Sequence, residues 1–215
     1  LELMIQDIKD LDDNIKQKNY LLEDSKTILD GTNRIASIVE SMREMASQAK
    51  ETPQESNIYA SLITSLTLSQ NKYSPITIQN ELFQIGMDKE AYRITAPIQI
   101  QRIEQVFIII INNALDALKA NRNFETRAFD ISLRDENGYI IASFQDNGGG
   151  IDEKILPHIF DPFQSTKQEG GIGLGLNVAK RIVEEHHGKI IALNHKGGAL
   201  FEVYLPKKPK VQIDE

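Results

Sequence analysis

The sequence predicts an α+β fold. An antiparallel helical hairpin, half of a dimeric four-helix bundle, precedes an α/β sandwich whose mixed sheet is covered by helices on one face. Apolar residues recur at spacings of three and four over roughly the first 50 residues, which is typical of amphipathic helices. Later segments alternate between apolar and polar residues around glycine-containing pairs, as hairpin strands do. Longer helical patterns lie between those strands, and this order favours helices packed against a sheet.

Residues 1–52 are predicted to form the hairpin. Its apolar positions include Leu1, Met4, Ile5, Ile8, Leu11, Ile15, Ile28, Ile35, Ile38, Val39, Met42 and Met45. We place the turn near Lys18-Asn19-Tyr20 and the end of the second helix before Pro53. Two helices with apolar stripes this broad cannot bury them alone, so we expect a homodimer through residues 1–52. A simple helical hairpin is the alternative.

The polar segment 53–57 is predicted to be a linker, and residues 58–208 a second domain. In this domain we expect helices over 58–70, 97–120 and 173–187, and strands over 76–82, 129–133, 139–144, 189–194 and 199–205. A hairpin turn is expected at Asn137-Gly138 and a short helix after Asp152. Gly188 is expected to stop the last helix.

Composition excludes several classes of function. A net charge of −7 disfavours nonspecific binding to nucleic acid or to an anionic membrane. The absence of cysteine excludes disulfides, thiolate metal clusters and a cysteine nucleophile, and it fits a reducing compartment. The longest apolar run, 106–111, is far shorter than the roughly 20 residues that span a bilayer. We therefore expect a soluble, cytoplasmic chain, whether it stands alone or is the cytoplasmic part of a membrane-bound protein.

The helix expected over 97–120 carries the pair Asn113-Ala114. A neutral amide oxygen on a helix is a suitable ligand for Mg²⁺, which takes oxygen ligands. Ile109 lies four residues earlier, one turn back on the same face. An aliphatic side chain cannot accept a proton, so hydrolysis that uses a base at this position is disfavoured.

Asp146 ends the strand that begins near Tyr139, and Asn147-Gly148-Gly149-Gly150-Ile151 follows it. Glycines let the backbone turn sharply and approach a flat ligand closely. A carboxylate accepts a hydrogen bond from the adenine amino group, which guanine lacks. Asp146 is therefore a candidate selector of adenine, although Asp-x-Gly-x-Gly alone is also a common turn.

Gly171, Gly173 and Gly175 precede and open a predicted helix, where free N–H groups and the helix dipole favour phosphate. A dinucleotide-binding fingerprint is the rival interpretation. It fails because no strand comes directly before the glycines, the final glycine is missing and no βαβ unit follows. In the preceding segment, Phe160 and Phe163 are candidate anchors of a mobile lid, and Lys167 is a candidate contact for a γ-phosphate. The alternative is that both phenylalanines belong to the ordinary core and that Lys167 is solvated.

Taken in order, four segments resemble the N, G1, G2 and G3 boxes of the ATP-binding domain of sensor histidine kinases. They are Asn112-Asn113-Ala114, Asp146 to Ile151, Gly171 to Leu176 and Gly197 to Phe201. Residues 159–167 resemble the F box of the same family. The resemblance covers roughly the last half of the chain and implies binding of ATP with Mg²⁺. It implies that the metal ligand is Asn113 and that the catalytic residue is Lys167. The nucleotide-binding residues that it implies are Asn113, Asp146, Gly148, Gly150, Ile151, Phe160, Thr166, Gly171, Gly173, Gly175 and Leu176.

The chain departs from the family pattern at three points. Related ATPases of the gyrase, chaperone and mismatch-repair type place a glutamate at the position of Ile109, and many histidine kinases place an asparagine there. Asp116 and Ala117 stand where family members often carry a basic or tyrosine side chain, which leaves that phosphate contact unassigned. Finally, the histidines all fall in the predicted second domain: His158, His186, His187 and His195. We expect the phosphoacceptor histidine to precede Leu1, or to have been lost.

The resemblance implies a protein-histidine kinase. Such an enzyme passes the γ-phosphoryl group of ATP to a histidine and then to an aspartate of a response-regulator receiver domain. Without the acceptor, we expect these residues not to autophosphorylate alone. A noncatalytic ATP-dependent binding or scaffold module is one alternative. A mitochondrial-type serine kinase is another, since it shares Asp-x-Gly-Gly-Gly, but its helical domain is larger than residues 1–52.

Overall fold

The structure is a computed structural model that describes part of the chain. The described residues are 5, 18–46, 52–72, 83–85, 93–120, 127–164 and 173–208. Their contacts divide the chain into two units, Leu1–Ala49 with Phe163–Leu174, and Lys50–Pro162 with Gly175–Glu215. Within the described ranges, no helix combines the length and the apolar character that crossing a bilayer requires.

The first unit contains helix α2, Lys18–Ala46. The turn predicted near Lys18-Asn19-Tyr20 is wrong, because these three residues begin the helix. They include no glycine or proline, so nothing in them interrupts a helical backbone. Apart from Ile5, the first predicted helix lies outside the described residues.

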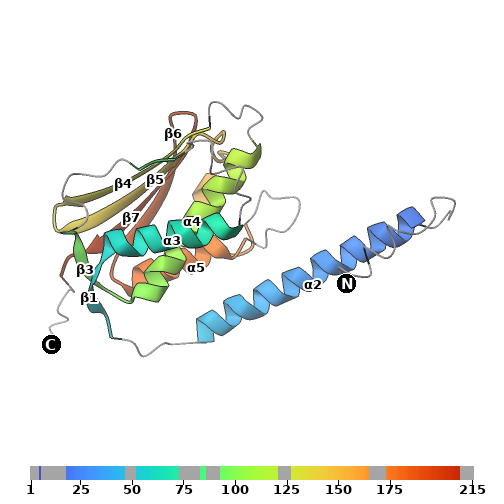
Figure 1. Ribbon diagram of the computed structural model, residues 1–215, viewed down its shortest axis with the longest axis horizontal. Helices are drawn as coiled ribbons and strands as arrows, with labels where there is room; N and C mark the ends of the chain where they lie inside the picture. The colour runs from blue at the N-terminus through green and yellow to red at the C-terminus, as the bar shows by residue number, and fades with distance from the viewer. Residues whose placement is uncertain are drawn as a thin grey trace. The chain divides into compact units, whose positions relative to one another are not determined.

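The second unit is built on a mixed sheet. Its described strands are β2 (Phe83–Ile85), β4 (Phe129–Glu136), β5 (Tyr139–Asp146), β6 (Lys189–His195) and β7 (Gly198–Pro206), in the order β2-β4-β5-β7-β6 (Figure 1). β2 runs parallel to β4, and the other neighbours are antiparallel. The predicted turn at Asn137-Gly138 is confirmed, with φ of 51° and 82° as a type I′ hairpin turn requires.

Three helices cover one face of this sheet, namely α3 (Ile58–Lys72), α4 (Ile100–Ala120) and α5 (Gly175–Glu185) (Figure 1). Alternate residues of β4 face them, and Phe129, Ile131 and Leu133 have no exposed surface. From α4, the Phe107 ring lies 5.6 Å from the Phe144 ring of β5, centroid to centroid. The α+β class with one covered sheet face is confirmed.

A second, two-stranded sheet lies where the sequence predicts a linker and a helix start. Strand β1, Gln54–Asn57, pairs antiparallel with β3, Thr95–Ile98. The polar residues of 53–57 thus include a strand of the second unit, and its partner is some 40 residues away in the chain. Pro97 lies in β3, so α4 begins at Ile100. The strand predicted over 76–82 lies outside the described residues.

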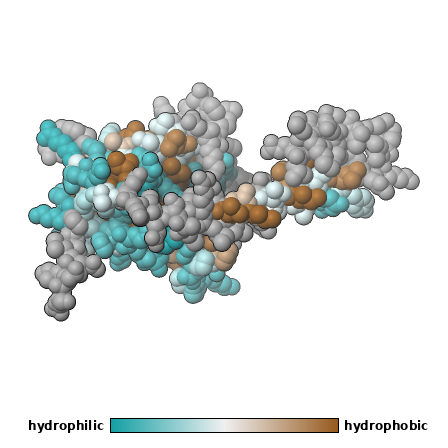
Figure 2. Space-filling model, turned by 90° about the horizontal axis from the view of Figure 1, so that it is seen from below, coloured by the Kyte–Doolittle hydropathy of each residue, from teal (hydrophilic) through white to brown (hydrophobic). Residues whose placement is uncertain are grey.

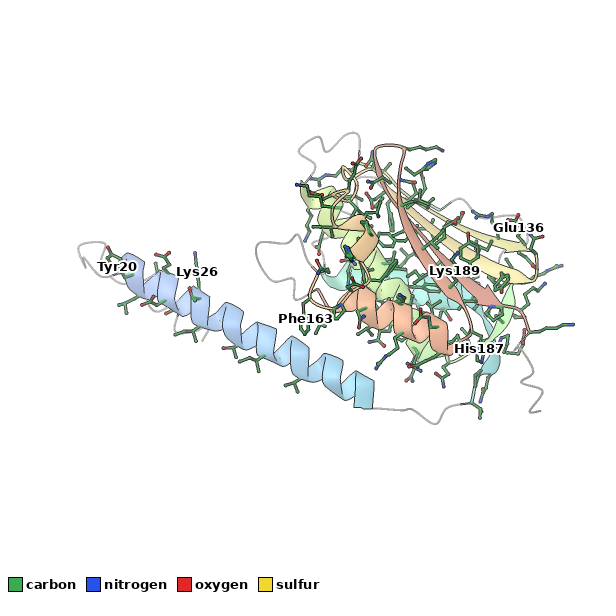
Figure 3. All side chains as sticks on the ribbon, turned by 180° about the vertical axis from the view of Figure 1, so that it is seen from behind. Tyr20, Lys26, Glu136, Phe163, His187 and Lys189 are labelled. Atoms are coloured by element: carbon green, nitrogen blue, oxygen red, sulfur yellow. The ribbon has the colours of Figure 1, made fainter. Side chains whose placement is uncertain are left out.

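The end of α5 differs in detail from the prediction. The left-handed residue is His187, with φ of 56°, and not Gly188; His187 lies at the end of α5 in Figure 3. The N–H groups of His187 and Gly188 donate to the carbonyl oxygens of Glu184 (2.8 Å) and Val183 (2.9 Å), which is a Schellman motif. Gly188 serves close packing, because a Cβ there would lie 2.3 Å from the Tyr204 carbonyl oxygen. The short helix expected after Asp152 is a 3₁₀ turn, Leu156–His158.

Candidate nucleotide-binding site

One face of α4 brings together the glycine-rich segments that the sequence singles out. Ile109, Asn113 and Ala117 follow one another at intervals of four residues, so they line the same face. A Cβ on Gly175, the first residue of α5, would lie 3.3 Å from Ile109 Cγ2. A Cβ on Gly148 would lie 2.6 Å from the Ala117 Cβ. The two glycine segments therefore meet α4 one turn before and one turn after Asn113.

The contact at Ala117 explains one departure from the family pattern. Gly148 approaches Ala117 so closely that a Cβ on Gly148 would also lie 2.8 Å from the Ala117 carbonyl carbon. A long basic or aromatic side chain at 117 would occupy the space of the 146–151 loop. At the other end of this face, Ile109 is partly buried and packs against the hydrophobic core.

Asp146 is held rigidly at the end of β5. The residue is 3% exposed, and Oδ1 accepts hydrogen bonds from the N–H groups of Gly148 (2.8 Å) and Ala199 (3.2 Å). Burial raises the pKa of Asp146, and the hydrogen bonds from Gly148 and Ala199 act against this. Among the described residues, no hydrogen bond reaches the second carboxylate oxygen, Oδ2.

The glycines after Asp146 have distinct roles. Gly149 and Gly150 have φ of 99° and 80°, a backbone conformation that side chains disfavour. The Gly149 N–H donates to the Gly197 carbonyl oxygen at 3.1 Å, which ties the loop to the β6–β7 turn. Gly198, in the same turn, has no room for a Cβ, because the Asp146 carbonyl oxygen would lie 1.8 Å from it.

Two asparagines that the sequence analysis did not select also hold this loop. Asn147 forms two hydrogen bonds with Ala128. The Asn147 N–H donates to the Ala128 carbonyl oxygen (3.2 Å), and Asn147 Oδ1 accepts from the Ala128 N–H (2.9 Å). Asn194, on β6, exchanges two hydrogen bonds with the backbone of Ile151. Asn194 lies in a predicted strand and Asn147 in the glycine-rich motif, but neither pattern indicates these contacts between distant segments.

The predicted lid is described only at its two ends. In the second unit, Phe160 packs against the hydrophobic core, and its carbonyl oxygen accepts a hydrogen bond from Asn177 Nδ2 at 3.0 Å. Phe163, in the first unit, is 67% exposed and has φ of 66°. Its N–H donates to the Gly173 carbonyl oxygen at 3.0 Å. Thr166, Lys167 and Gly171 lie outside the described residues.

The remaining described candidates are Ile151, Leu176, Gly175 and Gly173. Ile151 and Leu176 are partly buried and pack against the core. Gly175 opens α5, as the glycine pattern predicts for a residue that begins a helix. Gly173 has φ of 73° and belongs to the first unit.

Comparison with known proteins identifies the family. Residues 98–209, just over half of the chain, match the model of the histidine kinase-, DNA gyrase B- and HSP90-like ATPases. The chain belongs to this family. The resemblance to its sensor histidine kinases that the sequence motifs indicate is confirmed by the relatives and solved structures that follow.

Several curated relatives are two-component sensors. The two-component sensor PprA of Pseudomonas aeruginosa is 38% identical over 134 residues, which are 56% of this chain and 14% of PprA. The sensory histidine kinase/phosphatase NtrB of Salmonella typhimurium is 38% identical over 112 residues, or 49% of this chain and 32% of NtrB. The chain thus spans less than a third of the length of either relative.

Solved structures with the same fold are histidine kinases. The nucleotide-free catalytic domain of the histidine kinase ThkA has a TM-score of 0.62 at 29% identity, and the match covers 74% of this chain and 98% of that domain. ThkA in complex with the response regulator TrrA has a TM-score of 0.66 at 26% identity, covering 98% of this chain and 57% of that chain. The second unit therefore has the fold of a histidine kinase catalytic domain.

Proposed function

We propose that this chain binds Mg-ATP and is the catalytic part of a sensor histidine kinase. The observation that carries the proposal is the α4 face Ile109–Asn113–Ala117, on which the Asn113 amide lies between the approaches of Gly175 and Gly148. Ile109 and Ala117 are eight residues apart, so these contacts are separated by about 12 Å along the helix axis. An extended nucleotide fits this arrangement, with its base near Gly148 and its phosphates near Gly175.

At the base end, Asp146 selects adenine. Because the N–H groups of Gly148 and Ala199 hold Oδ1, the orientation of the carboxylate is fixed before any ligand arrives. Oδ2 then accepts a hydrogen bond from the adenine amino group. Guanine presents a carbonyl oxygen at the same place, and two acceptors facing each other repel. Gly150 and Ile151 complete the loop that borders the base.

At the phosphate end, the N-terminus of α5 and the glycines that precede it accept negative charge. The free N–H groups after Gly175 and the helix dipole favour phosphate, and Gly171, Gly173 and Leu176 belong to the same segment. Asn113 lies between base and phosphates, where its amide oxygen suits Mg²⁺, and the ion neutralises phosphate charge when bound. Phe160 anchors the lid that carries Thr166 and Lys167, and Lys167 contacts the γ-phosphate.

The reaction transfers the γ-phosphoryl group of ATP in two steps, first to a histidine and then to an aspartate. An imidazole nitrogen of a histidine upstream of Leu1 attacks the γ-phosphorus, the bond to the bridging oxygen breaks, and ADP leaves. The phosphoryl group then passes to a receiver-domain aspartate of a response regulator. Ile109 supplies no base that activates water, which favours transfer over hydrolysis. The complex of ThkA with TrrA supports a response regulator as the partner.

Helix α2 supports a homodimer through residues 1–52, and its proposed cytoplasmic location rests on the resemblance to sensor histidine kinases alone. Leu21, Ile28 and Ile35 recur every seven residues and are 42%, 57% and 64% exposed. Hydrophobic side chains follow the length of this helix in Figure 2. A seven-residue repeat of apolar side chains is typical of a helix that packs along another helix. A second copy of the chain provides such a helix.

A noncatalytic, ATP-dependent binding module is the second candidate. The observation that favours it is that every histidine of this sequence follows residue 157, outside the helical segment that carries the acceptor in histidine kinases. A histidine in the residues just upstream of Leu1 in the full-length protein distinguishes the kinase from the binding module.

The proposal is tested by nucleotide binding and by phosphotransfer. Asp146→Asn replaces an acceptor by a donor of the same shape, so ADP affinity falls at least about tenfold, the loss expected for one charge-assisted hydrogen bond. Asn113→Ala reduces the gain in ADP affinity that magnesium provides. With radiolabelled ATP, these 215 residues do not label themselves, whereas a longer protein that includes an upstream histidine does. Unchanged affinities in both variants contradict the assigned site, and self-labelling of the 215 residues contradicts the missing acceptor.

A further inference from the structure

Asn194 forms a two-point contact with the backbone of the adenine loop, residues 147–151. Its Oδ1 accepts a hydrogen bond from the Ile151 N–H at 2.7 Å, and its Nδ2 donates to the Ile151 carbonyl oxygen at 2.8 Å. A Cβ on Gly150 would lie 2.8 Å from Asn194 Oδ1, so the loop lies directly against this amide. One exposed side chain of β6 thus satisfies both polar backbone groups of Ile151.

The adenine loop has an unusual need for such a contact. It contains three consecutive glycines, and two of them have positive φ. Glycine loses more conformational freedom on ordering than any other residue, so a triple-glycine loop is costly to fix when a ligand binds. A loop that is already fixed in the free protein avoids that cost at the moment of binding.

The strand that carries Asn194 is itself tied to Asp146. Gln145 Nε2 donates to the His195 carbonyl oxygen at 3.0 Å and to the Asp146 carbonyl oxygen. In the same hairpin, the Ala199 N–H donates to Asp146 Oδ1, and Gly197 accepts from Gly149. The β6–β7 hairpin therefore holds both the carboxylate and the loop, and Asn194 is its side-chain contact to the far end of the loop.

We infer that Asn194 is a positioning residue for nucleotide binding, which fixes the backbone of the adenine loop in its binding conformation before the purine arrives. This inference rests on the proposed function. Asn194 acts through Ile151 and Gly150 and does not touch the ligand itself. Its loss lowers affinity for the base end of the nucleotide and leaves the magnesium contribution at Asn113 unchanged.

The test compares Asn194→Ala with His195→Ala, the adjacent exposed residue, whose side chain forms no hydrogen bond with the described residues of the loop. Isothermal titration with ADP, with magnesium and with EDTA, gives the dissociation constants of each variant and of the unsubstituted chain. For Asn194→Ala we expect affinity to fall about five- to 150-fold, the range for the loss of two neutral hydrogen bonds. The ratio of the constants with and without magnesium stays that of the unsubstituted chain, and His195→Ala binds normally.

A second measurement needs no nucleotide. Amide hydrogen exchange of Gly149, Gly150 and Ile151 accelerates in Asn194→Ala and not in His195→Ala, while exchange in the β5–β7 strands is unchanged. If Asn194→Ala impairs folding, Asn194→Ser replaces it in the test. The serine hydroxyl is too short to reach both groups of Ile151, so we expect an intermediate effect.

Each outcome decides a different claim. Normal ADP affinity in Asn194→Ala overturns the inference and leaves the proposed function standing. A parallel loss of ADP affinity, magnesium dependence and melting temperature also overturns it, because the role is then one of general stability. If the unsubstituted chain binds no ADP, the proposed function itself fails, whatever the exchange of the loop shows.

Discussion

Replacing Gly148 by alanine separates the adenine loop from α4. Gly148 has no positive φ, so alanine causes no backbone strain there. The new Cβ lies 2.6 Å from the Ala117 Cβ and 2.8 Å from the Ala117 carbonyl carbon, both shorter than any normal contact. Because the second atom is backbone of a buried helix, the loop must move. Overpacking of this kind costs about 1–3 kcal/mol, and at about 2–4 °C per kcal/mol the melting temperature falls by several degrees.

The more specific effect is on nucleotide affinity. Movement of Gly148 removes one of the two N–H groups that hold Asp146 Oδ1, so we expect ADP affinity to fall at least about tenfold. Gly138→Ala is the matched control. Gly138 has φ of 82° and open space around a new Cβ, and it lies in the turn after Glu136 (Figure 3), at the opposite end of β5 from Asp146.

We expect Gly138→Ala to lower the melting temperature through backbone strain of about 1–2 kcal/mol and to leave ADP affinity unchanged. Calorimetric titration with Mg-ADP and thermal unfolding of both variants measure the two effects separately. The reasoning is refuted if Gly148→Ala binds ADP normally, or if both variants lose affinity in proportion to their loss of stability.

Two further predictions concern pH. Burial lowers the pKa of His186. Its Nε2 accepts a hydrogen bond from the Gln99 N–H (3.0 Å), and its Nδ1 donates one to the Ile182 carbonyl oxygen (2.7 Å). The charged or titratable groups nearby are Arg102, Glu185 and His187. The neutral ring fits these hydrogen bonds, so its contribution to stability is complete above about pH 6.5 and is lost as pH falls through the lowered pKa. Between pH 7.5 and pH 5, the melting temperature therefore falls less steeply in His186→Gln than in the unsubstituted chain. An unchanged slope contradicts this. Burial raises the pKa of Glu202, but hydrogen bonds from Arg134, Tyr204 and Ser143 outweigh it and lower the pKa overall. The stability that these hydrogen bonds provide is therefore present above about pH 4.5 and is lost in stronger acid. Arg134→Met lowers the free energy of unfolding by about 0.5–1 kcal/mol at pH 7, a small value because the Arg134 side chain is 40% exposed. Urea unfolding at pH 7 and at pH 4 shows that this variant loses less stability in acid than the unsubstituted chain does.

Much of the candidate site follows from the sequence because its residues lie at strand or helix ends, or on one helix face, that patterns predict. Asp146 ends β5, a strand whose position the sequence predicts, and Gly175 opens a helix with a strongly apolar face. Asn113 and Ile109 share a face because a helix has a fixed period. These relations are local, so spacing along the chain is enough to predict them.

The contacts that bring these elements together are not local. Gly148, Gly188 and Gly198 are required by close approach to Ala117, Tyr204 and Asp146, none of which their own sequence neighbourhood reveals. A sequence shows that a glycine is present, but not whether the reason is φ or space. Strand β1 was missed for the same reason, since four polar residues pair with a strand some 40 residues away. The loop contact of Asn194 is likewise a tertiary one.

The central claim is that Asp146 selects adenine at a site beside the Asn113 face of α4. Titration calorimetry of the unsubstituted chain with Mg-ADP and with Mg-GDP tests it most directly. We predict one ADP site per chain, and GDP affinity lower by at least about tenfold, because a carbonyl oxygen replaces the amino donor opposite Asp146. Equal affinity for the two nucleotides, or no heat of binding with either for a folded sample, contradicts the claim.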